Sequence, residues 1–96
     1  MLMEEVLHYQ CFIRATEYRI TLKGMRFRPL AELVFRRGEV GQVAVSGGLP
    51  AMLMGKDDYL RCVDLLRNER PVFVEQDPDS GDVYLRTGDE PVGENE

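Results

Sequence analysis

The chain has 96 residues, of which 44% are hydrophobic and 30% charged, and its net charge is −5. This length suits one domain with a single hydrophobic core, and the composition is that of a globular protein rather than a disordered chain. No apolar run approaches the roughly 18 residues that cross a bilayer, and the first residues lack the features of a signal peptide. We therefore expect a cytoplasmic protein without membrane association.

The two cysteines, Cys11 and Cys62, lie far apart in the sequence and have no Cys or His neighbours at the spacing of metal ligands. In a reducing compartment such residues are free thiols. We expect no disulfide, no metal and no cofactor.

Two segments near the start alternate between apolar and polar side chains. Residues 7–13 place Leu7, Tyr9, Cys11 and Ile13 on one side, and residues 18–22 place Tyr18, Ile20 and Leu22 on one side before the alternation stops at Gly24. A period of two residues is typical of a half-buried strand. We predict two adjacent antiparallel strands.

Residues 25–28 alternate again and predict a short strand with Met25 and Phe27 on its buried side, ended or held at a sheet edge by Pro29. Residues 31–35 and 39–45 flank Gly38, which can adopt the positive φ that a tight turn needs. This pattern predicts a hairpin. Its first arm alternatively opens as a helical turn, because residues 30–33 all favour helix.

One helix is predicted from about residue 57 to about residue 68. Tyr59, Leu60, Val63 and Leu66 form its apolar stripe. Asp57 and Asp58 suit its amino end, where Asp57 is also placed to pair with Arg61, and Pro71 prevents continuation.

Residues 72–75 and 83–86 predict a final hairpin around a run of turn-forming residues. Residues 88–96 contain four acids and predict a mobile tail, which leaves residues 1–87 as a single domain. The expected fold is therefore α+β, with an antiparallel sheet of about five to six strands and one main helix packed on one face.

The segment 49–54 carries no polar side chain, although surface loops are normally polar. On an extended backbone, Met52 and Met54 face away from Leu49, Ala51 and Leu53. Methionine adapts to irregular apolar surfaces, so Met52, Leu53 and Met54 are candidate partner-binding residues. The alternative is that the whole segment closes the domain's own core.

Positive charge is concentrated in residues 25–37, where Arg26, Arg28, Arg36 and Arg37 outweigh a single acid, Glu32. Residues 71–96 contain eight acids and one arginine. The four arginines are candidate anion-binding residues if the fold brings them together, whereas the acidic total disfavours contact with nucleic acid.

Other chemical motifs fail on their spacing. The glycines before Lys56 do not match a phosphate-binding loop, and Asp77, Asp79 and Asp82 do not match a calcium-binding EF-hand loop. His8 is the single histidine, and on a strand it points away from Cys11. No catalytic residues are assigned.

The sequence thus leads to a small non-catalytic protein-interaction domain that acts as a homo-oligomer or as an accessory subunit. Its expected partner is itself or another protein. The alternative is a nucleic-acid or anion-binding module that uses the four arginines, and a small enzyme of unknown class ranks third.

Overall fold

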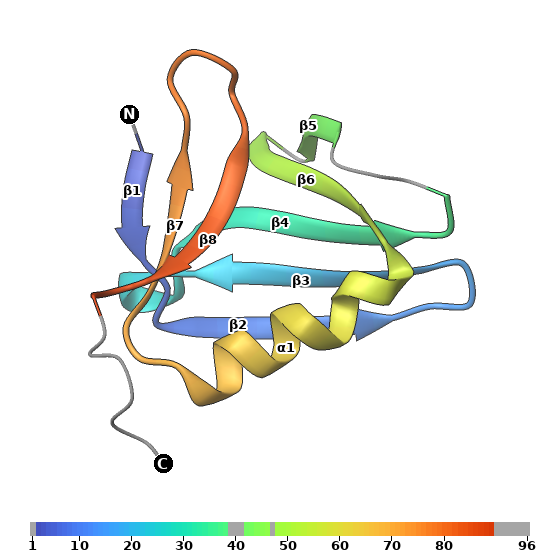
Figure 1. Cartoon of the computed structure of the whole chain (residues 1–96), viewed down its shortest axis with the longest axis horizontal. Helices are drawn as coiled ribbons and strands as arrows, with labels where there is room; N and C mark the ends of the chain where they lie inside the picture. The colour runs from blue at the N-terminus through green and yellow to red at the C-terminus, as the bar shows by residue number, and fades with distance from the viewer. Residues whose placement is uncertain (1, 39–41, 47, 90–96) are drawn as a thin grey trace.

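The computed structural model describes residues 2–38, 42–46 and 48–89, which form two sheets and one main helix (Figure 1). This arrangement confirms the α+β class. The predicted tail lies outside the described residues from position 90 onward, as do residues 39–41 of the predicted central hairpin. The elements in chain order are β1 (Leu2–Glu5), β2 (His8–Ile13), β3 (Glu17–Lys23), η1 (Met25–Phe27), β4 (Pro29–Arg36), β5 (Gln42–Ser46), β6 (Leu49–Gly55), η2 (Lys56–Asp58), α1 (Tyr59–Asn68), β7 (Val72–Gln76) and β8 (Val83–Thr87).

The larger sheet has the strand order β2-β3-β4-β6-β5. The predicted pairing of β2 with β3 is confirmed and is antiparallel. The predicted hairpin between β4 and β5 is wrong, because β6 lies between them, parallel to β4 and antiparallel to β5. The reason lies in β6 itself. Residues 49–54 are apolar at successive positions, so β6 presents apolar side chains on both faces of the sheet, a pattern that suits an interior strand better than a connection.

The smaller sheet has the order β1-β7-β8. The predicted hairpin of β7 and β8 is confirmed, and its turn is held by the Asp77 carboxylate, which accepts hydrogen bonds from the backbone N–H of Asp79 at 2.8 Å and of Ser80 at 3.3 Å. Strand β1 was not predicted, and it pairs antiparallel with β7.

Helix α1 covers the face of the larger sheet that carries the apolar side chains. The predicted start at about residue 57 is occupied by η2, and α1 begins at Tyr59. Leu60 was predicted to face the core and is instead 70% exposed, whereas Cys62 packs on the core. The side chain of Asp58 does not cap the helix. It pairs with Arg61 at 3.4 Å, the partner predicted for Asp57.

The core lies where the two sheets and the helix meet. Phe35 is fully buried and meets Tyr59 edge-on, with ring centroids 5.3 Å apart. The smaller sheet contributes Val74 and Val83, both with no exposed surface. The buried cluster consists of Ile20, Leu22, Leu30, Ala31, Leu33, Phe35, Tyr59, Val74 and Val83.

The predicted strand at residues 25–28 is wrong. Residues 25–27 form the tight turn η1, closed by a hydrogen bond from the N–H of Gly24 to the carbonyl of Arg28 at 2.8 Å. Arg26 and Phe27 both have a φ of 59°, a left-handed conformation that is uncommon for residues other than glycine. Alternation therefore breaks down, and Met25 and Phe27 are 70% and 62% exposed rather than buried. Proline at the first position of β4 costs no ladder hydrogen bond, which allows β4 to be an interior strand.

Within the described ranges, none of the helical segments has the length and apolar character required to cross a bilayer.

Candidate functional site

An apolar groove of about 380 Å³ opens between α1, β6 and β8. Most of its lining side chains are apolar. They come from β4 and β6 of the larger sheet, from β8 of the smaller sheet and from α1. The groove is lined by Leu33, Met52, Met54, Arg61, Cys62, Leu65, Tyr84 and Leu85. Because Leu33 is buried, it forms the floor, while the methionines and Leu85 are half-buried and form the walls.

The structure brings together two of the three candidate partner-binding residues. Met52 lies beside Leu33 and Met54 beside Phe35 in the parallel register of β6 with β4, so both methionines face α1. Leu53 has the opposite orientation, because successive side chains of a strand alternate. The methionines pack against the core and also line the groove.

The groove carries little charge. The Cys62 thiol is protonated at neutral pH, because burial raises its pKa to about 11. The Tyr84 hydroxyl donates a hydrogen bond to Glu75 at 3.0 Å, and this bond raises the pKa of Tyr84. Arg61 lies at the mouth with a side chain that is 82% exposed. The groove therefore combines an apolar interior with one cation at its rim.

The sequence did not identify Cys62, Leu65, Tyr84 or Leu85 as site residues. Leu65 lies outside the apolar stripe predicted for the helix, and Tyr84 and Leu85 belong to a strand of the other sheet. Their contact with the methionines depends on how the two sheets pack, which no local pattern encodes.

The four candidate anion-binding arginines are not brought together. Arg26 and Arg28 precede β4, whereas Arg36 is its last residue and Arg37 follows it, so the two pairs are separated by about 25 Å of extended chain. Arg28 pairs with Glu4, and Arg36 pairs with Glu17 at 2.8 Å. The compact basic surface envisaged from the sequence is absent from this arrangement.

Arg36 belongs to a network on the face of the larger sheet that is turned away from α1. The Glu17 carboxylate accepts hydrogen bonds from Arg19 and Arg36, and Arg19 also donates to Glu32 at 2.8 Å. Thr21 donates to the second oxygen of Glu32 at 3.2 Å. Hydrogen bonds from Arg19 and then from Arg36 lower the pKa of Glu17, and they outweigh the opposing effect of burial.

This lowered pKa predicts a loss of stability in acid. Above the ordinary carboxyl pKa of 4.5, Glu17 is ionised in both states and its pairing fully stabilises the fold. As the pH falls through the lowered pKa, the folded state must also bind the proton and the contribution disappears. Urea unfolding measures the free energy of unfolding at pH 7 and at pH 3. The decrease between the two pH values is expected to be smaller for Glu17→Gln than for the wild type. Asp64→Asn, a change of an exposed acid on α1, should leave the difference unaltered. An unaltered difference in Glu17→Gln would show that the network does not respond to pH.

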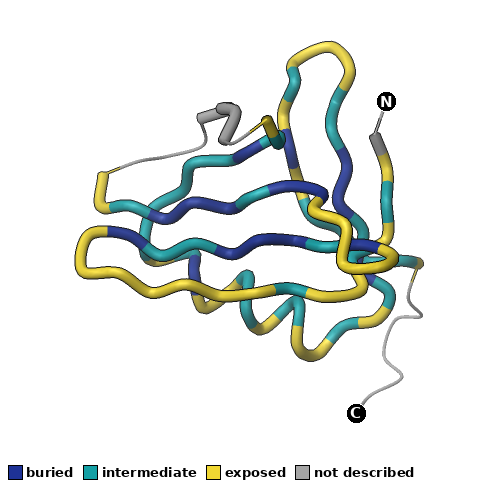
Figure 2. Tube along the Cα trace, turned by 180° about the vertical axis from the view of Figure 1, so that it is seen from behind, coloured by how far each residue is buried: buried dark blue, intermediate teal, exposed yellow. Residues whose placement is uncertain are grey.

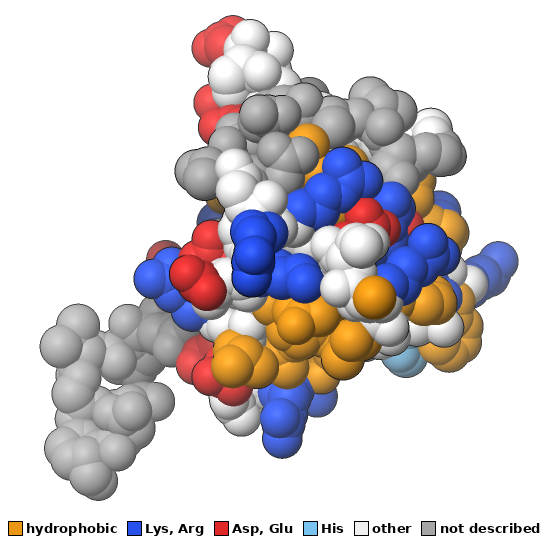
Figure 3. All heavy atoms as spheres, turned by 90° about the vertical axis from the view of Figure 1, so that its right-hand side faces the viewer, with side chains coloured by type: hydrophobic (Ala, Val, Ile, Leu, Met, Phe, Trp, Pro, Cys, Tyr) orange, Lys and Arg blue, Asp and Glu red, His pale blue; other side chains and the backbone are white. Residues whose placement is uncertain are grey.

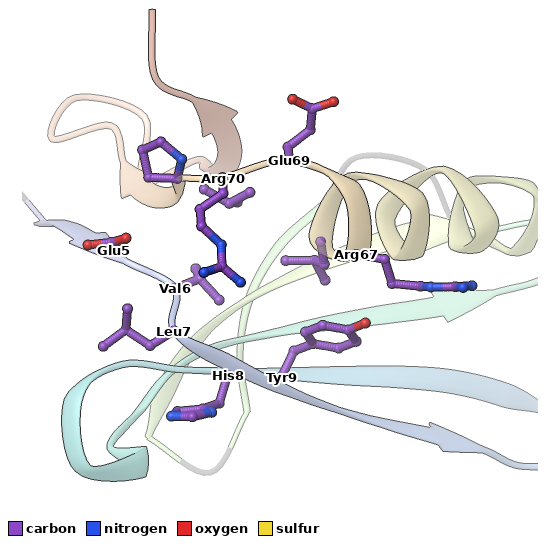
Figure 4. A pocket seen from close by; sticks show the side chains of 11 residues that line it. Glu5, Val6, Leu7, His8, Tyr9, Arg67, Glu69 and Arg70 are labelled. Carbon is purple, nitrogen blue, oxygen red and sulfur yellow. The ribbon is translucent and has the colours of Figure 1, made fainter.

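A second pocket, of about 420 Å³, lies where β2 begins and α1 ends (Figure 4). Arg70 extends into it above Val6, whereas Glu69 points away. His8, at its edge, stacks on Phe27 with ring centroids 4.1 Å apart. Its lining contains both charge signs but no cysteine or serine that His8 could activate.

The sequence offers two cysteines, one histidine and a group of acids as further candidates for chemistry. Both cysteines are free thiols, and His8 and Cys11 occupy opposite faces of β2. In the described part of the chain, no three His, Cys, Asp or Glu side chains are grouped so as to hold a metal ion.

Comparison with models of known protein families, with curated proteins and with solved structures finds no match to this chain.

Proposed function

We propose that this protein is a non-catalytic interaction domain that binds an apolar side chain of a partner protein in the groove between α1, β6 and β8. The observation that carries the proposal is the groove itself, whose apolar lining is open at the surface. Its volume falls within the roughly 300–1,000 Å³ of typical binding pockets. Met52 and Met54 provide flexible walls that can adapt to the shape of an inserted side chain.

The charge at the rim defines the partner further. Arg61 is the cation among the groove residues, and its side chain is largely exposed beside Asp58. A partner carboxylate placed next to the inserted side chain would pair with Arg61, and such rim contacts contribute more to specificity than to affinity. The expected recognition motif is a bulky apolar residue with a neighbouring Asp or Glu.

Selection of peptides from a phage-displayed random library tests this proposal. Peptides that bind the wild type are expected to share the apolar and acidic motif. Met54→Lys keeps an aliphatic stem of similar length but places an ammonium group in the groove, so peptide binding should weaken at least about tenfold, or about 1.4 kcal/mol. Leu60→Lys is the control, because it adds the same charge on α1, which forms one wall of the groove, at a position outside the groove lining.

A charge exchange provides the second arm. Arg61→Glu should weaken the binding of the acidic peptide. Replacing the acidic residue of the peptide by lysine should restore binding to this variant. The proposal is wrong if folded Met54→Lys, verified by circular dichroism, binds the selected peptides as tightly as Leu60→Lys does. Failure to enrich any peptide with the expected motif would also contradict it.

A further inference from the structure

Strand β2 forms one edge of the larger sheet and is exposed along most of its length (Figure 2). Its pairing with β3 is regular from His8 opposite Lys23 to Ile13 opposite Tyr18. Phe12 and Ile13 are 42% and 70% exposed, although large apolar side chains of this kind are usually covered.

The backbone groups that β2 leaves free follow from its hydrogen-bonding pattern. The N–H of Arg14 donates to the carbonyl of Glu17 at 2.8 Å, which makes these two residues a hydrogen-bonded pair. Such pairs alternate along an antiparallel ladder, so the even-numbered residues of β2 bond to β3. The N–H and C=O groups of Tyr9, Cys11 and Ile13 therefore point outward.

This edge lacks the features by which proteins usually prevent strands from pairing with one another. Charged side chains, proline and bulges serve that purpose. Residues 8–13 contain no proline and no Asp, Glu, Lys or Arg, and the register with β3 shows no bulge. Strand β1, at an edge of the smaller sheet, instead ends in Glu4 and Glu5. Strand β2 therefore presents a flat, uncharged edge that is open to another strand.

We propose that a second copy of this chain pairs with β2, antiparallel to it, about a two-fold axis at Cys11. In this register Cys11 lies opposite its own counterpart, and Tyr9 lies opposite Ile13 of the second copy. Every outward backbone group of the three residues then finds a partner, which gives six hydrogen bonds by the antiparallel pattern. The resulting sheet is continuous through both copies.

Neighbouring registers satisfy fewer groups. With the axis at Gln10, Ile13 would lie opposite Leu7, whose N–H already donates to the carbonyl of Lys23 at 2.9 Å. With the axis at Phe12, Tyr9 would lie opposite a residue beyond the end of β2. The first of these registers leaves the Ile13 carbonyl without a partner, and the second leaves both outward groups of Tyr9 without one. The backbone therefore favours the axis at Cys11.

The side chains fit the same register. An aromatic residue opposite a β-branched one is a stabilising cross-strand pair, and Tyr9 opposite Ile13 forms it twice. Ile13 shares a surface pocket of about 450 Å³ with Leu60, which is also 70% exposed. Figure 3 shows hydrophobic side chains gathered at this end of the molecule, with basic ones around them. Tyr9 of the second copy would cover part of this apolar surface.

Sedimentation of the wild type, Ile13→Lys and Met25→Lys tests the interface. Ile13 and Met25 are equally exposed, so each substitution should leave the fold intact, but Met25 belongs to η1 and not to β2. The wild type and Met25→Lys should be dimers at high concentration, and Ile13→Lys should dissociate at least tenfold more readily. A wild type that stays monomeric up to millimolar concentration would overturn the proposal, as would an undiminished dimer of Ile13→Lys.

Disulfide trapping tests the register. Paired Cys11 residues would have Cα atoms about 5.5 Å apart, within the range of a disulfide. In a Cys62→Ser background, the oxidant diamide should couple the two Cys11 thiols, taking up their two electrons and two protons. The control with Cys11→Ser and Ile13→Cys places its thiols four residues out of register and should remain uncoupled. Equal coupling in both, or no coupling at Cys11, would overturn the two-fold axis at Cys11. Peptide binding in the groove is measured separately, so either proposal can fail alone.

Discussion

Replacing Phe35 by alanine is expected to lower the free energy of unfolding by about 3–5 kcal/mol. Phe35 has no exposed surface, and its ring packs edge-on against Tyr59 at the start of α1. The substitution removes this contact and leaves a cavity between the larger sheet and the helix, which the surrounding strands can close only in part. Urea or thermal unfolding measures the loss.

Phe27→Ala is the matched control, because Phe27 is 62% exposed and contacts His8 on the opposite side of the sheet. Its expected cost is within about 1 kcal/mol. Similar losses in the two variants would contradict the position of Phe35 in the core.

Replacing Val74 by aspartate is expected to destabilise the protein by about 3–5 kcal/mol or to unfold it, because an unpaired carboxylate would lie in a closed apolar core. Val74 is fully buried where the smaller sheet packs on the larger one. Val74→Thr has nearly the same shape but adds a hydroxyl, so its loss should be smaller, about 1–3 kcal/mol. Circular dichroism during urea unfolding measures both.

The two Val74 variants test how the sheets join. If the smaller sheet did not pack on the larger one, Val74 would be accessible to solvent, and aspartate and threonine would both be tolerated. An aspartate variant with wild-type stability would therefore contradict the fold.

Local patterns in the sequence predicted the elements that depend on near neighbours. The alternation in residues 7–13 and 18–22 identified β2 and β3, and the turn-forming residues 77–82 identified the hairpin of β7 and β8. The helix was predicted from its stripe, although Leu60 proved exposed. An apolar stripe in the sequence predicts that a helix is present better than it predicts which side of the helix faces the sheet. The packing against the sheet decides which side chains are buried.

Pairings between distant segments were not predictable in the same way. The parallel contact of β4 with β6 requires β5 to fold back at the sheet edge, and the apolar run 49–54 indicated burial without naming its neighbours. The two residues with positive φ angles in the turn are Arg26 and Phe27. Neither is a glycine or an asparagine, so their residue types do not predict this conformation. In both places tertiary contacts override local preference.

The candidate site was only partly predictable for the same reason. The composition of residues 49–54 identified Met52 and Met54, because an apolar segment is expected to pack against other residues rather than to lie open to solvent. Leu53, the third candidate, lies on the other face of the sheet. The remaining walls of the groove come from α1 and β8, which meet β6 through the packing of the two sheets.

Chemical-shift mapping tests the interaction groove most directly. On titration of ¹⁵N-labelled protein with a selected peptide, we predict that the largest changes fall on the backbone amides of Arg61, Cys62, Leu65, Tyr84 and Leu85, the groove residues of α1 and β8. Met54→Lys should strongly reduce these changes at the same peptide concentration. Changes confined to β2, or centred on the pocket beside Arg70, would contradict the groove as the binding site.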